Sequence, residues 1–224
     1  MTRTLFVGDV HGCIDELRHL VEDVVQLGAH ERLVLVGDLV ARGPDSGAVI
    51  AYARARSALA VRGNHEAHLL AYRRGERKEL GAAHRIAASQ MHEDDWKYLE
   101  SMPVLRDFPE HALRVVHAGM DPHERWDRQH EDVLLTIRHV KGREGDAVQW
   151  GSLYEGPPHV VFGHDARAGL QLHAWCTGLD TGCVYGGLLT GLVLAHEQRI
   201  PHDPEERAKH LVSTPALQRY HPIK

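Results

Sequence analysis

The chain of 224 residues is poor in cysteine, with only Cys13, Cys176 and Cys183. An odd and sparse set of cysteines is unsuited to a disulfide framework and is typical of a reducing compartment. Long apolar runs are also missing. A membrane-spanning helix needs about 20 consecutive apolar residues, and no stretch of this sequence is that long. The short run that ends at Val7 meets Asp9, which indicates a strand and not a signal peptide. We therefore expect a cytoplasmic protein without a membrane partner.

An excess of positive charge is missing as well. The 26 Lys and Arg against 31 Asp and Glu give a net charge of −5 with histidine neutral. Because nucleic-acid binding needs a basic face, we expect no nucleic-acid partner. An anionic substrate would have to be held by metal ions and a few arginines.

Short apolar runs of strand length recur along the chain, at 4–7, 33–36, 58–61, 113–116 and 159–162. Between the first two runs, apolar residues from Ile14 to Leu27 repeat at helical spacing, and Gly28 can end that helix. Ser46 can cap a second helix. Strands that alternate with helices predict a parallel sheet of an α/β fold, whose sites lie beyond the carboxyl ends of the strands.

The remaining segments suggest how the chain is divided. We expect one domain over residues 1–200, with a helical lid at about 67–102 where mixed charges replace the apolar runs. Trp96 and Tyr98 in this lid could stack on a nucleobase, or they could form the core of the lid itself. The polar segment 201–224, which carries four of the prolines, is expected to be a surface tail.

Each of the five apolar runs is followed directly by side chains that bind metal ions. The five motifs are Gly-Asp-Val-His-Gly at 8–12, Gly-Asp-Leu-Val-Ala-Arg-Gly at 37–43, Gly-Asn-His-Glu at 63–66, Val-His-Ala-Gly at 116–119 and Gly-His-Asp at 163–165. Any single motif could be an ordinary strand-end turn. Five of them together indicate a metal centre, because they supply carboxylates, imidazoles and an amide at one edge of the fold.

The chemistry of the ligands suggests two ions. Asp9 and His11 are two residues apart, so they face the same side of an extended strand end. Asp38 has two carboxylate oxygens and can bridge two ions. Mixed nitrogen and oxygen ligands suit Mn, Fe, Zn or Co better than Mg or Ca. Two ions that share a bridge polarise a phosphoryl group and make hydroxide from water at neutral pH.

Two residues next to these ligands are candidates for contacts with substrate. Arg42 follows Asp38 in a turn, and its guanidinium can hold phosphate oxygens bidentately. His65 neighbours Asn64 and is a candidate general acid for the leaving oxygen. Most of the 19 histidines have surface or core positions in this interpretation. His84 and His221 receive no role, and His68 is interpreted as structural.

The combined motifs resemble the calcineurin-like metallophosphoesterases, in the phosphoprotein-phosphatase branch. Three details further resemble symmetrical diadenosine tetraphosphate hydrolases: Gly-Asp-Leu-Val-Ala-Arg-Gly-Pro at 37–44, His-Ala-Gly at 117–119 followed by Pro122, and Leu-Asp-Thr-Gly-Cys at 179–183 followed by Tyr185 and two glycines. The resemblance extends to about residue 195. It implies an α/β fold of the metallophosphatase type, a β-sandwich with flanking helices (αββα).

The resemblance also implies roles at matching positions. Asp9 and His11 would hold one ion, Asp38 would bridge, and the second ion would be held by Asn64, His117 and His164. The ions would be two divalent metals, with Mn preferred over Co, Fe or Zn. Arg42 and His65 would contact the phosphate and the leaving group. Arg138 is the candidate second arginine, with Arg143 or Arg167 as alternatives, and Tyr185 would bind substrate.

The expected function is hydrolysis of dinucleoside polyphosphates, above all diadenosine tetraphosphate to two ADP. One departure from the protein phosphatases supports it: they carry Asp where this chain has Ala41, as the tetraphosphate hydrolases do. Glu66 instead matches the protein phosphatases. A Ser/Thr or broad phosphoprotein phosphatase, with phosphoproteins as partners, therefore remains the alternative. A non-catalytic nucleotide-binding module is a remote one, because such modules usually lose ligands first.

Overall fold

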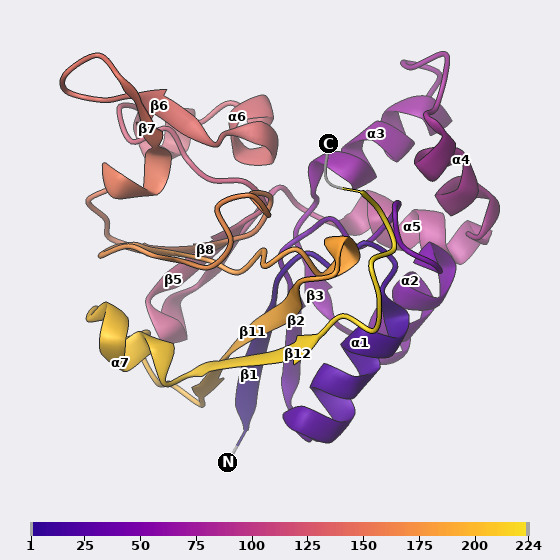
Figure 1. Ribbon diagram of the computed structural model, residues 1–224, viewed down its shortest axis with the longest axis horizontal. Coiled ribbons are helices and arrows are strands. Elements are labelled where there is room, and N and C mark those ends of the chain that lie inside the picture. The colour runs from indigo at the N-terminus through magenta and orange to yellow at the C-terminus, as the bar shows by residue number, and fades with distance from the viewer. Residues whose placement is uncertain (1, 223–224) are drawn as a thin grey trace.

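The computed structural model describes residues 2–222, and its centre is a pair of five-stranded sheets (Figure 1). The first sheet has the order β12-β11-β1-β2-β3, formed by Leu211–Pro215, Leu188–Ala195, Arg3–Val7, Arg32–Leu35 and Leu59–Ala60. Strands β1, β2 and β3 are parallel, as the alternation of strands and helices predicts. The edge formed by β11 and β12 is antiparallel.

The second sheet has the order β4-β5-β8-β10-β9, formed by Leu105–Phe108, Leu113–Val116, His159–Phe162, Cys176–Gly178 and Gln171–Leu172. Its three central strands, β5, β8 and β10, are parallel. A separate hairpin consists of β6, His139–Lys141, and β7, Ala147–Gln149. All five apolar runs named above therefore contribute strands, three to the first sheet and two to the second.

Helices cover the outer face of each sheet. On the first sheet lie α1 and the helical segment η1 that continues it, with α2, α3, α4 and α5 (Figure 1); their bounds are Ile14–Arg18, His19–Val24, Ser46–Ala55, Asn64–Arg73, Ala82–Ser89 and Glu93–Ser101. On the second sheet lies α6, Glu131–Thr136. Single helical turns at 109–111, 126–128, 150–152 and 183–185 and the short helix α7, Pro204–Ala208, complete the described helices.

Three apolar clusters separate these layers. One joins the helices to the first sheet and includes Leu5, Leu17 and Ile50. The second lies between the sheets, where Phe6 packs edge-on against Phe108 with ring centroids 5.2 Å apart. The third packs Leu134 of α6 and Trp150 against the second sheet. The layers run helix, sheet, sheet, helix, so the αββα sandwich is confirmed.

Two local features differ from the sequence-based expectations. The cap of α2 is Asp45, whose side chain accepts the N–H of Ala48, while the hydroxyl of Ser46 accepts the N–H of Ala41 at 2.9 Å. The segment after residue 200 was expected to be a surface tail, but it contains α7 and β12. Strand β12 pairs with β11 because Leu211–Pro215 is extended and β11 has a free antiparallel edge. No helix among the described residues is long and apolar enough to span a membrane.

The two aromatic residues of the proposed lid are part of the helical layer. Trp96 is 8% exposed and packs in the cluster under the first sheet, with the guanidinium of Arg73 4.9 Å from its ring centroid. The hydroxyl of Tyr98 donates to the carbonyl of Ala58 at 2.8 Å. Helix α5 packs against α2. The structure therefore gives both rings the core role that was the alternative to stacking on a nucleobase.

Replacing Trp96 with Ala should lower the free energy of unfolding by about 3–5 kcal/mol, because it leaves a large cavity in the core. Chemical denaturation followed by circular dichroism measures this change. Trp126 is 60% exposed and provides the control, since Trp126→Ala should cost less than about 1 kcal/mol. Equal stability of Trp96→Ala and wild type would contradict the core assignment.

Candidate metal centre

The carboxyl ends of parallel strands from both sheets meet at one edge of the sandwich. Asp9 and His11 follow β1, and Asp38 follows β2. Asn64 opens α3 directly after β3, His117 follows β5 and His164 follows β8. All are buried or nearly so, although they come from five distant parts of the chain. The structure thus brings all six sequence-predicted ligands into one region.

The carboxylate of Asp38 lies between two groups of possible ligands. Its Oδ2 is 3.5 Å from Nε2 of His11 and 3.9 Å from Nε2 of His65. Its Oδ1 is 3.4 Å from Nε2 of His117. Each group offers ligand atoms within 4.8 Å of one another, the first from His11, Asp38 and His65, the second from Asp38, His117 and His164. Among residues 2–222, Asp38 alone belongs to both groups.

The second group is completed by the amide of Asn64. Its Oδ1 lies 3.0 Å from Nε2 of His117 and 3.0 Å from Nδ1 of His164. The other ring nitrogens face backbone carbonyls, Nδ1 of His117 at 3.0 Å from Val36 and Nε2 of His164 at 3.2 Å from Thr136. Such outer contacts fix the orientation of metal-ligating imidazoles. The inward nitrogens of both rings are thereby aimed at one point.

Asp9 takes a different position from the other candidates. Both of its carboxylate oxygens accept the backbone N–H of His164 at 3.1 Å, and it is not a member of either compact group. Burial, followed by the charge of Asp180, raises the pKa of Asp9 well above its ordinary value. Asp180, in the Leu-Asp-Thr-Gly motif, is also buried, and burial raises its pKa to about 6.

The charges at this edge fit a cation site. Asp9, Asp38 and Asp180 are all less than 6% exposed. Buried carboxylates are costly unless a cation or hydrogen bonds compensate them. Burial alone would lower the pKa of His117, but the charge and hydrogen bond of Asp38 outweigh it and raise that pKa to about 10. The hard oxygen and imidazole donors present fit divalent transition metals.

The backbone at this edge is strained. The φ angles of five residues lie in the left-handed region, at 47° for His11, 49° for Asp38, 67° for Ala41, 70° for Arg42 and 70° for His164. Non-glycine residues rarely adopt this conformation, and where they do it often marks a functional site. The strain here coincides with the ligands and with Arg42, which supports a role for these turns beyond connecting strands and helices.

Two glycines allow the turns to approach one another. A Cβ atom at Gly63 would lie 2.3 Å from Oδ1 of Asp38, and one at Gly163 would lie 1.9 Å from Oδ1 of Asp9. Neither separation is tolerated by real atoms. The glycines in the motifs at 63–66 and 163–165 are thus required for packing the carboxylates against the neighbouring backbone.

Glu66 is a positioning residue for which the sequence suggested no role. Its Oε2 accepts the N–H groups of Asp38 and Gly63 at 2.9 and 2.8 Å, and its Oε1 accepts those of Leu39 and Val40 at 2.8 and 3.2 Å. The side chain is fully buried. One carboxylate therefore holds the turn that carries Asp38. Its position three residues after Gly63 is a capping-box spacing, which was the available signal in the sequence.

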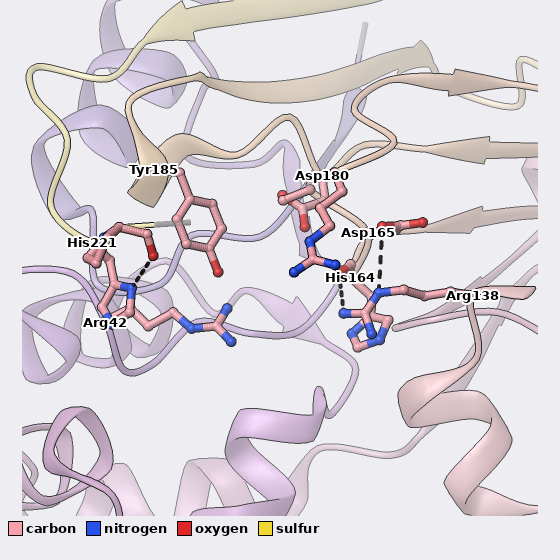
Figure 2. Close-up of a pocket in the computed structure, with 10 residues that line it drawn as sticks. Arg42, Arg138, His164, Asp165, Asp180, Tyr185 and His221 are labelled. Carbon is pink, nitrogen blue, oxygen red and sulfur yellow. Dashed lines mark hydrogen bonds and ion pairs between the residues drawn. The ribbon is translucent and has the colours of Figure 1, made fainter. Parts of the chain in front are cut away.

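A pocket of about 270 Å³ opens beside the ligands (Figure 2). Arg42, Tyr185 and His221 lie on one side of it, and Asp180, Arg138 and His164 lie on the other. The guanidinium of Arg42 is 5.6 Å from the ring centroid of Tyr185, and its Nη1 is 2.9 Å from Nε2 of His11.

Arg138 is held at the pocket by two groups. Its Nε lies 3.5 Å from Oδ1 of Asp165, and its Nη2 donates to the carbonyl of His164 at 3.2 Å (Figure 2). Arg167 lines the same pocket, whereas Arg143 is not among its lining residues. The pocket thus presents several guanidinium groups next to the metal ligands, an arrangement that suits a phosphate chain.

His65 lies against Asp38 and is covered by the proposed lid. The ring of His84 in α4 stacks on it, with centroids 4.7 Å apart and planes 16° from parallel. Nδ1 of His65 is buried without a hydrogen-bond partner. Burial lowers the pKa of His65 well below its usual value despite the nearby Asp38. The sequence had assigned His84 no role, and no periodicity or motif indicated this contact.

Replacing Asp38 with Asn should lower the occupancy of both ions together, because the change removes the one charge shared by the two ligand groups. Replacing His164, a member of one group only, should reduce chiefly one ion. Metal content per chain after loading and desalting, measured by plasma mass spectrometry, tests both. An Asp38→Asn protein that retains two tightly bound ions would overturn the bridging assignment.

Three comparisons with known proteins agree with this geometry. Residues 2–168 match the model of the calcineurin-like phosphoesterase family. The chain is 30% identical over 215 residues to the asymmetrical bis(5'-nucleosyl)-tetraphosphatase PrpE of Halalkalibacterium halodurans, covering 83% of this chain and 87% of the relative. It is 36% identical over 143 residues to the symmetrical bis(5'-nucleosyl)-tetraphosphatase of Shewanella sp. (strain MR-7), covering 61% of this chain and 51% of the relative.

Solved structures give the same result. A crystal structure assigned as a diadenosine tetraphosphatase superposes with a TM-score of 0.81 at 34% identity, covering 96% of this chain and 94% of the other. A protein serine/threonine phosphatase from Saccharomyces cerevisiae has a TM-score of 0.63 at 15% identity, covering 100% and 81%, and shares the fold. The chain belongs to the calcineurin-like phosphoesterase family, and it is a metal-dependent phosphohydrolase.

Proposed function

We propose that this protein hydrolyses dinucleoside polyphosphates, with diadenosine tetraphosphate as the preferred substrate. The observation that carries the proposal is the carboxylate of Asp38 between two ligand groups, directly beside a pocket lined by arginines. Relatives at 30% and 36% identity are named as tetraphosphatases of this type. The chain spans about half the length of the symmetrical relatives and most of the length of the asymmetrical one.

The metal ligands follow from the two groups. His11 and Asp38 would hold one ion with Asp9, and Asp38, Asn64, His117 and His164 would hold the other. Two divalent ions supply charge to the phosphoryl oxygens and an activated water. Manganese is our first choice among Mn, Co, Fe and Zn, because the donors are a mixture of imidazole nitrogens and oxygens. Asp9 would have to release the N–H of His164 in part to reach its ion.

Arg42 and Arg138 would bind the phosphate chain from opposite sides of the pocket. Both arginines line the pocket. Bidentate contacts from their guanidinium groups would orient the scissile phosphate for in-line attack. Tyr185 lies under the guanidinium of Arg42 and would limit its movement. The two guanidinium groups would also neutralise the negative charge that develops on the transferring phosphoryl group.

Ala41 favours a phosphoanhydride over a serine or threonine phosphomonoester. A serine alkoxide is a poor leaving group and needs a proton from a well-oriented histidine. Ala41 has no carboxylate to orient His65, and Nδ1 of His65 has no hydrogen-bond partner. ADP leaves as a stabilised anion and needs less help. His65 would then contact the leaving phosphate without a strong requirement for proton transfer.

Cleavage into two ADP is our first choice, and cleavage into AMP and ATP is the alternative. The motifs at 37–44, 117–119 and 179–183 favour the symmetrical outcome. The relative named as asymmetrical favours cleavage into AMP and ATP, because its match covers more of both chains. Phosphoproteins remain possible partners through the shared fold of the phosphoprotein phosphatases. Three free cysteines are the reason to propose a reducing compartment such as the cytoplasm.

Purified protein loaded with Mn²⁺ should hydrolyse diadenosine tetraphosphate with a higher catalytic efficiency than a phosphoserine peptide, and the products should be ADP alone. Liquid chromatography of the products and the two efficiencies at one metal concentration test this. The Asp38→Asn protein is the matched control for contaminating activity. AMP plus ATP would replace the symmetrical assignment, and a preference for the phosphopeptide would refute the proposed substrate.

A further inference from the structure

A further cluster of possible metal ligands lies outside the two groups that share Asp38. The edge of the sandwich that carries those two groups is called the catalytic edge below. The sulfurs of Cys13 and Cys183 and a carboxylate oxygen of Glu16 lie within 4.8 Å of one another. The three residues are 0%, 1% and 2% exposed. Cys13 stands at the N-cap position of α1, Glu16 lies in the first turn of α1, and Cys183 opens the turn at 183–185. None of the three is used by the proposed hydrolysis.

The carboxylate of Glu16 is only half satisfied. Its Oε1 accepts the backbone N–H of Leu217 and the hydroxyl of Tyr220, both at 2.9 Å. Its Oε2 is buried and has no hydrogen-bond partner. An unpaired carboxylate oxygen in an apolar interior is costly, and a bound cation would remove that cost. The surroundings are apolar, since Ile14, Leu17 and Val184 belong to the same hydrophobic cluster.

We propose that Cys13, Glu16 and Cys183 form a third divalent-metal site, separate from the pair of ions at Asp38. Two thiols and a carboxylate favour a soft or borderline ion, above all Zn²⁺, whereas the catalytic edge offers only nitrogen and oxygen donors. Binding would release the two thiol protons to solvent, so that two thiolates and one carboxylate face one dication. The burial of all three donors is typical of a structural site.

Such an ion would join three parts of the chain that surround the catalytic edge. Cys13 follows the ligand His11 by two residues, and Cys183 precedes Tyr185 by two. Glu16 holds Leu217 and Tyr220 of the C-terminal segment. Tyr220 and His221 in turn donate their N–H groups to the carbonyl of Val184. The ion would therefore fix the loop after β1, the turn with Tyr185 and the segment that brings His221 to the pocket.

Metal content separates the two sites. Protein purified under reducing conditions, loaded with Zn²⁺ and desalted should contain about three ions per chain. Asp38→Asn should retain about one of them and Cys183→Ser about two. Cys176→Ser is the matched control, because Cys176 is also buried but lies in β10 of the second sheet. This variant should retain all three ions. Glu16→Gln provides a second variant that keeps both thiols and should weaken the binding of the third ion.

Cobalt gives a direct readout on the wild-type chain. Co²⁺-loaded wild type and Cys176→Ser should show a thiolate-to-cobalt charge-transfer band, and this band should be lost in Cys183→Ser with a folded circular dichroism spectrum. Two ions per wild-type chain and no thiolate band would overturn the third site. That result together with hydrolysis of diadenosine tetraphosphate would leave the proposed function intact, whereas three ions without hydrolysis would refute only the function.

Discussion

The carboxylate of Asp38 is the constraint on which the catalytic edge depends. It must remain ionised in an interior position, with His11 and His65 on one oxygen and His117 on the other. A buried carboxylate can persist only where cations and hydrogen-bond donors surround it. The αββα sandwich provides these by ending parallel strands from two sheets at one edge, so that ligands separated by as many as 155 residues meet.

The local backbone serves the same constraint. Glu66 collects four N–H groups from the turn of Asp38 and from Gly63, and this fixes the bridging carboxylate from behind. Left-handed conformations at His11, Asp38, Arg42 and His164 direct side chains toward the centre at a cost in strain. That cost is offset by the rest of the molecule, where three apolar clusters bury the layers. A rigid scaffold of this kind holds catalytic groups in place before substrate arrives.

The sequence predicted the scaffold well because its signals are local. Runs such as Leu33–Val36 are apolar, short and closely followed by a ligand, here Asp38, so both the strand and the position of the ligand could be inferred. Contacts that depend on packing could not. The burial of Trp96 against α2, the clamp made by Glu66, the stacking of His84 on His65 and the pairing of β12 with β11 all join segments that no periodicity connects. Asp45 replaced Ser46 as the cap of α2 because both residues can cap, and only the turn geometry selects one.

The bridging role of Asp38 is the central claim, and it is tested most directly by anomalous diffraction from crystals of the protein loaded with Mn²⁺. The account predicts two anomalous peaks about 3.5–4 Å apart. The carboxylate of Asp38 should contact both ions. His11 should contact one ion, and His117 and His164 the other. A single peak, or two peaks of which only one touches Asp38, would contradict the account.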